Sequence, residues 1–245
     1  MKFSEEINQY ISGERFSAGL DIHFSKEKYP DRTRIDKIIE ITKNKRVIHI
    51  GCADHLPLIE QKIKNRKWLH GLLNESTSEC IGLDTNKKAV KFINEKLRIN
   101  NVYYPDKTAY NLILNDEKHW DYIVLGEIIE HVDNPVAFLR ELKERYKNKV
   151  DRIIITAPNV FNLLTIKDIL NNLENINTDH RYWFSPFTLT KIVSIAGYFS
   201  PEICFVERTK LPMTKAIVKR IKQVLGMPLY FNANCFSNIL LIADF

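Results

Sequence analysis

The sequence has few cysteines, and their arrangement would hold neither a metal ion nor a disulfide framework. Four cysteines occur in 245 residues, Cys52, Cys80, Cys204 and Cys235, and no two of them form a Cys-x-x-Cys pair. No cluster of cysteine and histidine has the spacing of a zinc site. We therefore expect no metal site and no disulfides, which is typical of a protein kept in a reducing compartment.

Long apolar runs are also missing. No stretch of 18 apolar residues occurs, so no transmembrane segment is expected. The first residues, MKFSEEINQYISGERF, contain no apolar core long enough for a signal peptide. We expect a soluble protein located in the cytoplasm.

The charge balance is only mildly one-sided. There are 36 basic and 30 acidic residues, for a net charge of +6 and a pI near 9.0. This balance permits an anionic small-molecule partner. No basic patch with interleaved aromatic residues dominates any segment, so a nucleic-acid partner is not favoured. The oligomeric state is left open.

Glycine is scarce where a phosphate-binding loop would need it. The stretch VIHIGCADHL (residues 47–56) indicates a buried strand that enters a turn, and Gly51 is its one glycine. A dinucleotide loop needs several glycines, so that the pyrophosphate can approach the backbone. Ala53 and His55 stand in those places. NAD is therefore disfavoured, and the absence of any GxxxxGK[ST] excludes a P-loop.

A nucleoside ligand without phosphates fits this loop better. S-adenosylmethionine (SAM) is such a ligand, and one tight glycine with a nearby carboxylate suits it. Asp84 ends a second short strand, IGLD, and could accept hydrogen bonds from both ribose hydroxyls. The alternative is that Asp84 caps the helix that follows.

Strand and helix patterns alternate along the chain. Helices are expected near 33–41, 56–73, 85–97, 134–146, 161–173 and 186–196, and strands at 46–50, 80–84, 101–104, 121–127, 152–159, 202–207 and 237–245. Asn134 and Pro135 give the clearest helix start, as N-cap and first residue. This alternation predicts an α/β fold, a Rossmann-like, seven-stranded, mostly parallel sheet with helices on both faces.

We expect one domain over residues 1–245 with two additions. Residues 1–45 would form an N-terminal helical lid or decoration, and residues 208–236 an insertion between the last two strands. The insertion contains a basic amphipathic helix at 213–225, which could be a lid or a membrane-surface contact.

Several motifs together resemble a known family. VIHIGC, IGLD, GEIIEHVDNP, IIITAPN and HRYWFSPFTL followed by AGY occur in this order between residues 45 and 207. They resemble the class I SAM-dependent methyltransferases, in particular a group associated with bacterial surface-polysaccharide and sugar modification. GERFSAG (13–19) resembles a leader motif of that group. The loop departs from the family pattern of acid-x-G-x-G-x-G at His49, Ala53 and His55.

The resemblance implies a set of binding residues. For the cofactor SAM these are Gly51, Cys52, Asp54, Asp84, Thr85, Glu127 and Ile128, and for the acceptor Arg15, Asp179, Tyr182 and Trp183. The adjacent aromatic residues could instead belong to the core.

Two histidines are candidates for the catalytic base. Methyl transfer requires alignment of the acceptor atom, and a hydroxyl acceptor benefits from a base with a pKa near neutrality. His131 follows the fourth strand, and His180 lies on the segment expected to face the acceptor. Each could instead be structural, and Glu130 is an alternative base.

The function expected from these features is SAM-dependent O-methylation. The acceptor would be small or nucleotide-linked, carrying a sugar hydroxyl or a phosphate-type group in capsule or lipopolysaccharide biosynthesis. The alternatives are an RNA or other nucleic-acid methyltransferase and a non-catalytic partner protein with the same fold. An NPPY-like motif of base-methylating enzymes is absent after the fourth strand, where GEIIEH stands instead. The least favoured interpretation is that the protein is an NAD-dependent enzyme.

Overall fold

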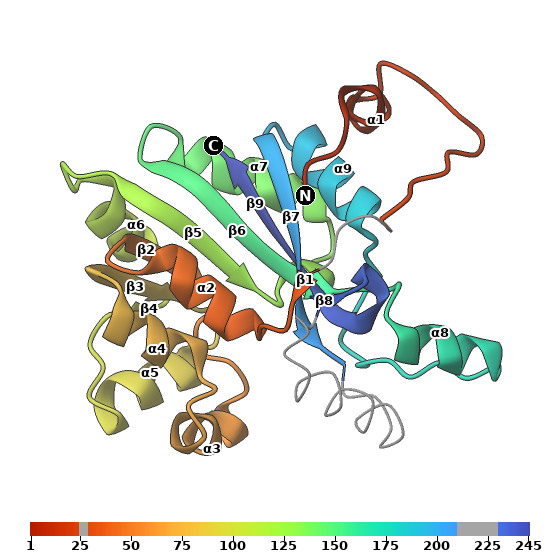
Figure 1. The fold of residues 1–245 in the computed structure, drawn as a ribbon. Helices are drawn as coiled ribbons and strands as arrows, with labels where there is room; N and C mark the ends of the chain where they lie inside the picture. Colours follow the sequence, from red (N-terminus) through yellow and green to blue (C-terminus); the bar gives the residue numbers. More distant parts are fainter. Residues whose placement is uncertain (25–28, 210–229) are drawn as a thin grey trace.

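A twisted sheet of seven strands organises the chain (Figure 1). The computed structural model describes residues 1–24, 29–209 and 230–245. The strands lie in the order β4-β3-β2-β5-β6-β9-β7. Their bounds are β2 (Arg46–Ile50), β3 (Glu79–Leu83), β4 (Val102–Tyr103), β5 (Trp120–Gly126), β6 (Val150–Pro158), β7 (Phe199–Arg208) and β9 (Phe236–Asp244). A separate two-stranded ribbon joins β1 (Tyr29–Pro30) to β8 (Tyr230–Phe231).

Strand direction confirms the predicted fold class. Strands β4, β3, β2, β5 and β6 run parallel, whereas β9 lies antiparallel between β6 and β7. The strand order reverses at β2, which pairs with β3 on one side and β5 on the other. In sheets of this kind, ligands bind beyond the carboxyl ends of the strands at such a switch point.

Helices pack on both faces of the sheet (Figure 1). One face is covered by α2 (Arg34–Thr42) and α4 (Leu69–Ser76), and the other by α6 (Lys107–Leu114), α7 (Pro135–Tyr146) and α9 (Pro186–Ile195). The remaining described helices are α1 (Glu5–Ser12), α3 (Ile59–Lys64), α5 (Lys87–Lys96) and α8 (Leu163–Leu170), with single 3₁₀ turns η1 (Leu56–Leu58), η2 (Ile129–His131) and η3 (Ala233–Cys235).

The isoleucine run of β6 shows why this central strand is apolar throughout. Ile153, Ile154 and Ile155 are all fully buried. Ile153 and Ile155 pack with the α7 and α9 side, whereas Ile154 packs with the α2 and α4 side. Successive side chains of a strand point to opposite faces, so a strand covered on both faces needs apolar residues at every position.

The predicted start of α7 is confirmed. The Asn134 side chain accepts a hydrogen bond from the Ala137 backbone N–H at 3.0 Å, and Pro135 is the first helical residue. The N-cap satisfies one of the backbone donors left free at a helix start.

The single helix expected over 56–73 is wrong. The segment forms η1 and α3, then a break over residues 65–68, and then α4. Arg66 adopts a positive φ of 51°, which ends α3 in a turn. The indole N–H of the buried Trp68 donates to the Cys52 carbonyl oxygen at 3.0 Å, so the break is anchored beneath the first loop.

Parts of the N-terminal 45 residues pack against the sheet, which a peripheral decoration would not do. Ile38 of α2 is fully buried against the sheet. Met1 pairs with β7, because its amino group donates to the Ile203 carbonyl oxygen at 2.6 Å and its carbonyl accepts from the Ile203 N–H at 2.8 Å. Residues 13–24, by contrast, contain neither helix nor strand.

The described helix α6 was not expected, although Asp106 caps it as its residue type favours, whereas α1 lies in the N-terminal segment that was expected to be helical. The basic helix expected at 213–225 lies outside the described residues. Within the described ranges, every helix is too short or too polar to cross a bilayer.

Replacing Ile154 tests the two-sided packing of β6. We expect Ile154→Ala to lower the free energy of unfolding by about 2–5 kcal/mol, because a fully buried side chain would leave a cavity. Ile169→Ala, at a side chain that is 60% exposed on α8, should change it by less than about 0.5 kcal/mol. Urea titration of the three proteins makes the comparison, and equal losses would contradict the assignment.

Candidate functional site

A cavity opens at the carboxyl ends of β2, β3 and β5, as the strand order predicts. Its volume is 740 Å³, within the usual range for small-molecule sites. All seven residues expected to contact a cofactor line it: Gly51, Cys52, Asp54, Asp84, Thr85, Glu127 and Ile128. His131, Asp179 and His180 line the same cavity. The structure therefore brings the cofactor candidates and three acceptor-side candidates to one place.

Gly51 is required by the turn after β2. Its φ is +74°, a conformation that other residues rarely adopt, and a Cβ atom there would clash with the Ile128 side chain. The next loop position, Ala53, is fully buried, and its backbone N–H donates to Asp84 Oδ2 at 2.9 Å. The loop thus keeps one indispensable glycine.

Asp84 joins the two loops that border the cavity. Its Oδ2 accepts from Ala53, and its Oδ1 accepts from the Asn86 backbone N–H at 2.8 Å. The alternative of a helix cap is wrong, because the Asn86 side chain caps α5. A carboxylate has about four acceptor positions, so two remain for hydroxyl donors.

The other polar residues of the loop are held by the protein. Asp54 has a φ of +59°, and its carboxylate pairs with Lys62. His49 is 3% exposed, and its Nδ1 lies 3.4 Å from Nδ1 of His70. Burial lowers the pKa of His70 to about 4, and burial together with the charge of His70 lowers the pKa of His49 well below its usual value. Both imidazoles are therefore neutral at pH 7.

Two carboxylates follow β5 and enter the cavity. Glu127 has a φ of +59°, and its Oε2 accepts from Asn238 Nδ2 at 2.8 Å. Glu130 has no exposed surface, and neither of its oxygens has a hydrogen-bond partner within the described part of the chain. Burial, and then the charge of Glu127, raise the pKa of Glu130 to about 8.

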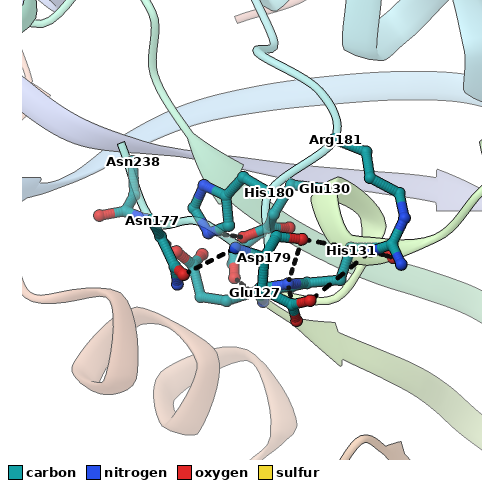
Figure 2. A network of polar contacts seen from close by, with 9 residues as sticks. Glu127, Glu130, His131, Asn177, Asp179, His180, Arg181 and Asn238 are labelled. Atoms are coloured by element: carbon teal, nitrogen blue, oxygen red, sulfur yellow. Dashed lines mark hydrogen bonds and ion pairs between the residues drawn. The ribbon is translucent and has the colours of Figure 1, made fainter. Parts of the chain in front are cut away.

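The segment that carries His180 is held against η2 (Figure 2). The Arg181 backbone N–H donates to the Glu130 carbonyl oxygen at 2.8 Å, and the Tyr182 hydroxyl donates to the Asp133 carbonyl oxygen at 2.7 Å. These bonds place His180 Nε2 at 3.9 Å from Glu130 Oε1.

The two histidines meet in the same cluster (Figure 2). Their ring centroids are 4.7 Å apart, and His131 Nδ1 lies 2.9 Å from Asp179 Oδ2. A carboxylate only accepts, so Nδ1 carries the proton in this contact. Burial, with a smaller effect from His131, lowers the pKa of His180, which favours its neutral form.

Three residues expected to bind the acceptor do not line this cavity. Arg15 lies over the Tyr10 ring at 5.0 Å, in the N-terminal segment. Tyr182 is tied to Asp133, and Trp183 lines a separate cavity of 280 Å³ beside α8. Other residues that line the cavity were not singled out in the sequence: Arg34, Tyr110, Phe138, Arg145 and Asn177.

Comparison with known proteins gives a family match over most of the chain. A family model described as "Methyltransferase domain" matches residues 25–199. The match begins before α2 and ends at the start of β7, so it includes every residue of the cavity named above.

Solved structures share the fold. A SAM-dependent methyltransferase from Archaeoglobus fulgidus superposes with a TM-score of 0.52 and 21% identity, over 86% of this chain and 91% of that one. One from Thermotoga maritima, described as a possible histamine N-methyltransferase, gives 0.52 and 14% over 86% of each chain. The small RNA methyltransferase HEN1 gives 0.52 and 17% over 86% of this chain and 24% of that one.

The curated relatives that match this chain are described by a different function from that of the family model. The DNA replication and repair protein RecF of several Clostridium botulinum strains is 29% identical over 184 residues, which is 70% of this chain. The chain spans 42% of the length of these curated relatives.

The neutral histidine pair predicts a pH dependence of stability. The unfolded chain binds a proton at His70 below about pH 6.5, whereas the folded chain does so only near pH 4. The free energy of unfolding should therefore fall as pH is lowered from 6.5 to 4, by about 3 kcal/mol for His70. We expect His70→Gln to flatten this dependence in urea titrations. His119→Gln, at a side chain 61% exposed, should keep it, and an unchanged slope in His70→Gln would contradict the prediction.

Proposed function

The chain belongs to the methyltransferase-domain family, and from this premise we propose that it is a SAM-dependent enzyme that methylates a hydroxyl oxygen. The acceptor is a small or nucleotide-linked molecule. The observation that carries the proposal is the single cavity that joins the Gly51–Asp84 side to the Glu130–His131–His180 side. A donor and an acceptor held in one cavity can be aligned for direct transfer.

The loop residues fit the cofactor. Gly51 permits the tight turn that borders the cavity, and Asp84 retains acceptor positions for two hydroxyls. When bound, SAM supplies a methyl group on a positively charged sulfur. Glu127, on the next strand end, offers a carboxylate oxygen without a hydrogen-bond partner on the described protein.

The acceptor side fits an oxygen nucleophile. A hydroxyl must lose its proton as its oxygen bonds to the methyl carbon and the carbon–sulfur bond breaks. His180 is half-buried, and its lowered pKa favours the neutral form that can take a proton. His131 is oriented by Asp179. We therefore assign the binding and deprotonation of the acceptor hydroxyl to His131, His180 and Glu130.

A role in surface-polysaccharide biosynthesis is the finer part of the proposal. It is supported by the motifs GEIIEHVDNP and HRYWFSPFTL, which resemble those of the sugar-modifying group. Arg34 at the cavity supplies positive charge for an anionic acceptor such as a nucleotide-sugar, whereas Lys62 and Arg145 are paired with Asp54 and Glu141.

RNA is the second candidate acceptor. The fold is shared with a small RNA methyltransferase, and the net charge of +6 would favour a polyanion. The mixed-charge lining of the cavity fits a small acceptor better than a polyanion, because it contains carboxylates beside the cations.

Asp84 provides the test of cofactor binding. We expect isothermal titration to show SAM binding that Asp84→Ala weakens by about 10- to 100-fold, as lost hydrogen bonds to a charged group would do. Asp151→Ala, at an exposed residue of the opposite end of β6, should bind as the wild type does. Undiminished affinity in Asp84→Ala would contradict its role.

A product assay tests the acceptor. Wild-type protein, SAM and a panel of nucleotide-sugars, capsular precursors and RNA oligonucleotides are incubated, and methylated products are identified by mass spectrometry. We expect O-methylated sugar products, with turnover reduced at least about 100-fold in His131→Ala and His180→Ala while SAM binding persists. Near wild-type turnover in both variants would remove the base assignment, and methylated RNA alone would favour the second candidate.

A further inference from the structure

The centre of the cluster is a carboxylate that the protein does not satisfy. Glu130 is fully enclosed, and both side-chain oxygens lack a hydrogen-bond partner within the described residues. An enclosed carboxylate without partners costs several kcal/mol, so such groups are normally paired or coordinate a metal. His180 Nε2 is near Oε1, but its 3.9 Å separation is too long for a hydrogen bond.

Three potential metal ligands converge at this point (Figure 2). Glu130, His131 and His180 each offer one ligand atom, and these atoms lie within 4.8 Å of one another. Glu130 and His131 come from η2, and His180 comes from the segment that Arg181 ties to η2. Atoms at that separation can surround one cation with small side-chain adjustments.

The surroundings resemble those of a metal ligand set. A ligating histidine usually donates its other ring N–H to a carboxylate, and His131 Nδ1 does so to Asp179. Its Nε2 then remains for an ion. The Asp179 backbone N–H in turn donates to Asn177 Oδ1 at 3.1 Å, which holds the carboxylate in place. His180 is half-buried, so its ring is also confined.

The local charge calls for a cation. Glu127 lies beside Glu130, and its Oε1 is a third enclosed carboxylate oxygen without a hydrogen-bond partner among the described residues. Two neighbouring carboxylates repel each other, whereas a divalent ion next to neutral imidazoles would balance both.

We propose that Glu130, His131 and His180 bind one divalent first-row transition-metal ion at the wall of the methyl-transfer cavity. One carboxylate and two imidazoles form the three-ligand set of catalytic sites that leave positions open for substrate. From the sequence we expected no metal site, because the spacing of cysteines and histidines gave no zinc pattern. That criterion cannot detect a ligand group that contains a glutamate and comes from two segments far apart in the chain.

The ion deepens the proposed function, on which this inference rests. An acceptor hydroxyl that occupies an open coordination position has a lowered pKa and is oriented toward the methyl group. Its O–H bond breaks, and because His180 would then be bound to the ion, the proton passes to solvent rather than to His180. The oxygen then bonds to the methyl carbon, and the electron pair of the carbon–sulfur bond stays on sulfur. The acceptor class is therefore an alcohol able to coordinate a metal.

Mn²⁺ binding to the full chain tests the site directly. After dialysis against a chelator, titration followed by electron paramagnetic resonance should show one bound Mn²⁺ per chain, with spin-echo modulation from imidazole nitrogen. We expect Glu130→Gln to weaken binding at least about 100-fold and Asp179→Asn by about 10- to 100-fold. The control Glu144→Gln, on the exposed face of α7, should bind as the wild type does.

Two results would overturn the inference. One is equal Mn²⁺ affinity in wild type and Glu130→Gln, with both proteins shown to be folded by circular dichroism. The other is a Mn²⁺ signal without nitrogen modulation, or with the same modulation in His180→Ala. Zn²⁺ that displaces the bound Mn²⁺ stoichiometrically would support a common site.

Separate measurements keep this inference distinct from the proposed function. SAM titration of the chelator-treated protein tests the cofactor, and the product assay with and without Mn²⁺ tests the ion. Methylation that persists without metal would leave the proposed function standing and overturn the inference. Specific Mn²⁺ binding without any SAM binding would contradict the proposed function and leave the metal site standing.

Discussion

The parallel pairing of β2 with both β3 and β5 is the interaction on which the site depends. It places Ile50 beside Leu83 and Leu125, so the next residues of all three strands emerge at one edge of the sheet. This register, rather than any contact among Gly51, Asp84 and Glu127, brings these three residues close together. The apolar layers on both faces of the sheet hold these strands between their covering helices.

The acidic side chains at this edge of the sheet repel one another, and this unfavourable arrangement indicates a ligand-binding site. Glu127 and Glu130 are two acids in a confined space, and Glu130 has neither exposed surface nor a hydrogen bond within the described part of the chain to compensate its burial. The protein nevertheless holds them firmly, through Asn238 on one side and the Arg181 backbone on the other. Structure that maintains an unfavourable arrangement is typical of functional sites.

The two sides of the cavity differ in how readily a sequence reveals them. The side proposed to bind the cofactor is formed by residues that follow strands, and all seven predicted residues line the cavity. The acceptor side is assembled by the segment at 177–184, which has little regular structure. There Asp179 and His180 reach the cavity, whereas Tyr182 and Trp183 do not. Side-chain direction in such a segment depends on hydrogen bonds to η2, and no local pattern encodes those.

Hydrophobic periodicity and turn residues by themselves determined the strands, most helices, the sheet class and the place of the cofactor loop. They could do so because each of these depends on neighbouring residues and on the period of the backbone. The break at Arg66, the neutral His49–His70 pair and the meeting of Glu130 with His131 and His180 were decided only by the tertiary structure. Each depends on burial and on distances between segments far apart in the chain, which alter conformation, pKa and charge balance without changing any local pattern.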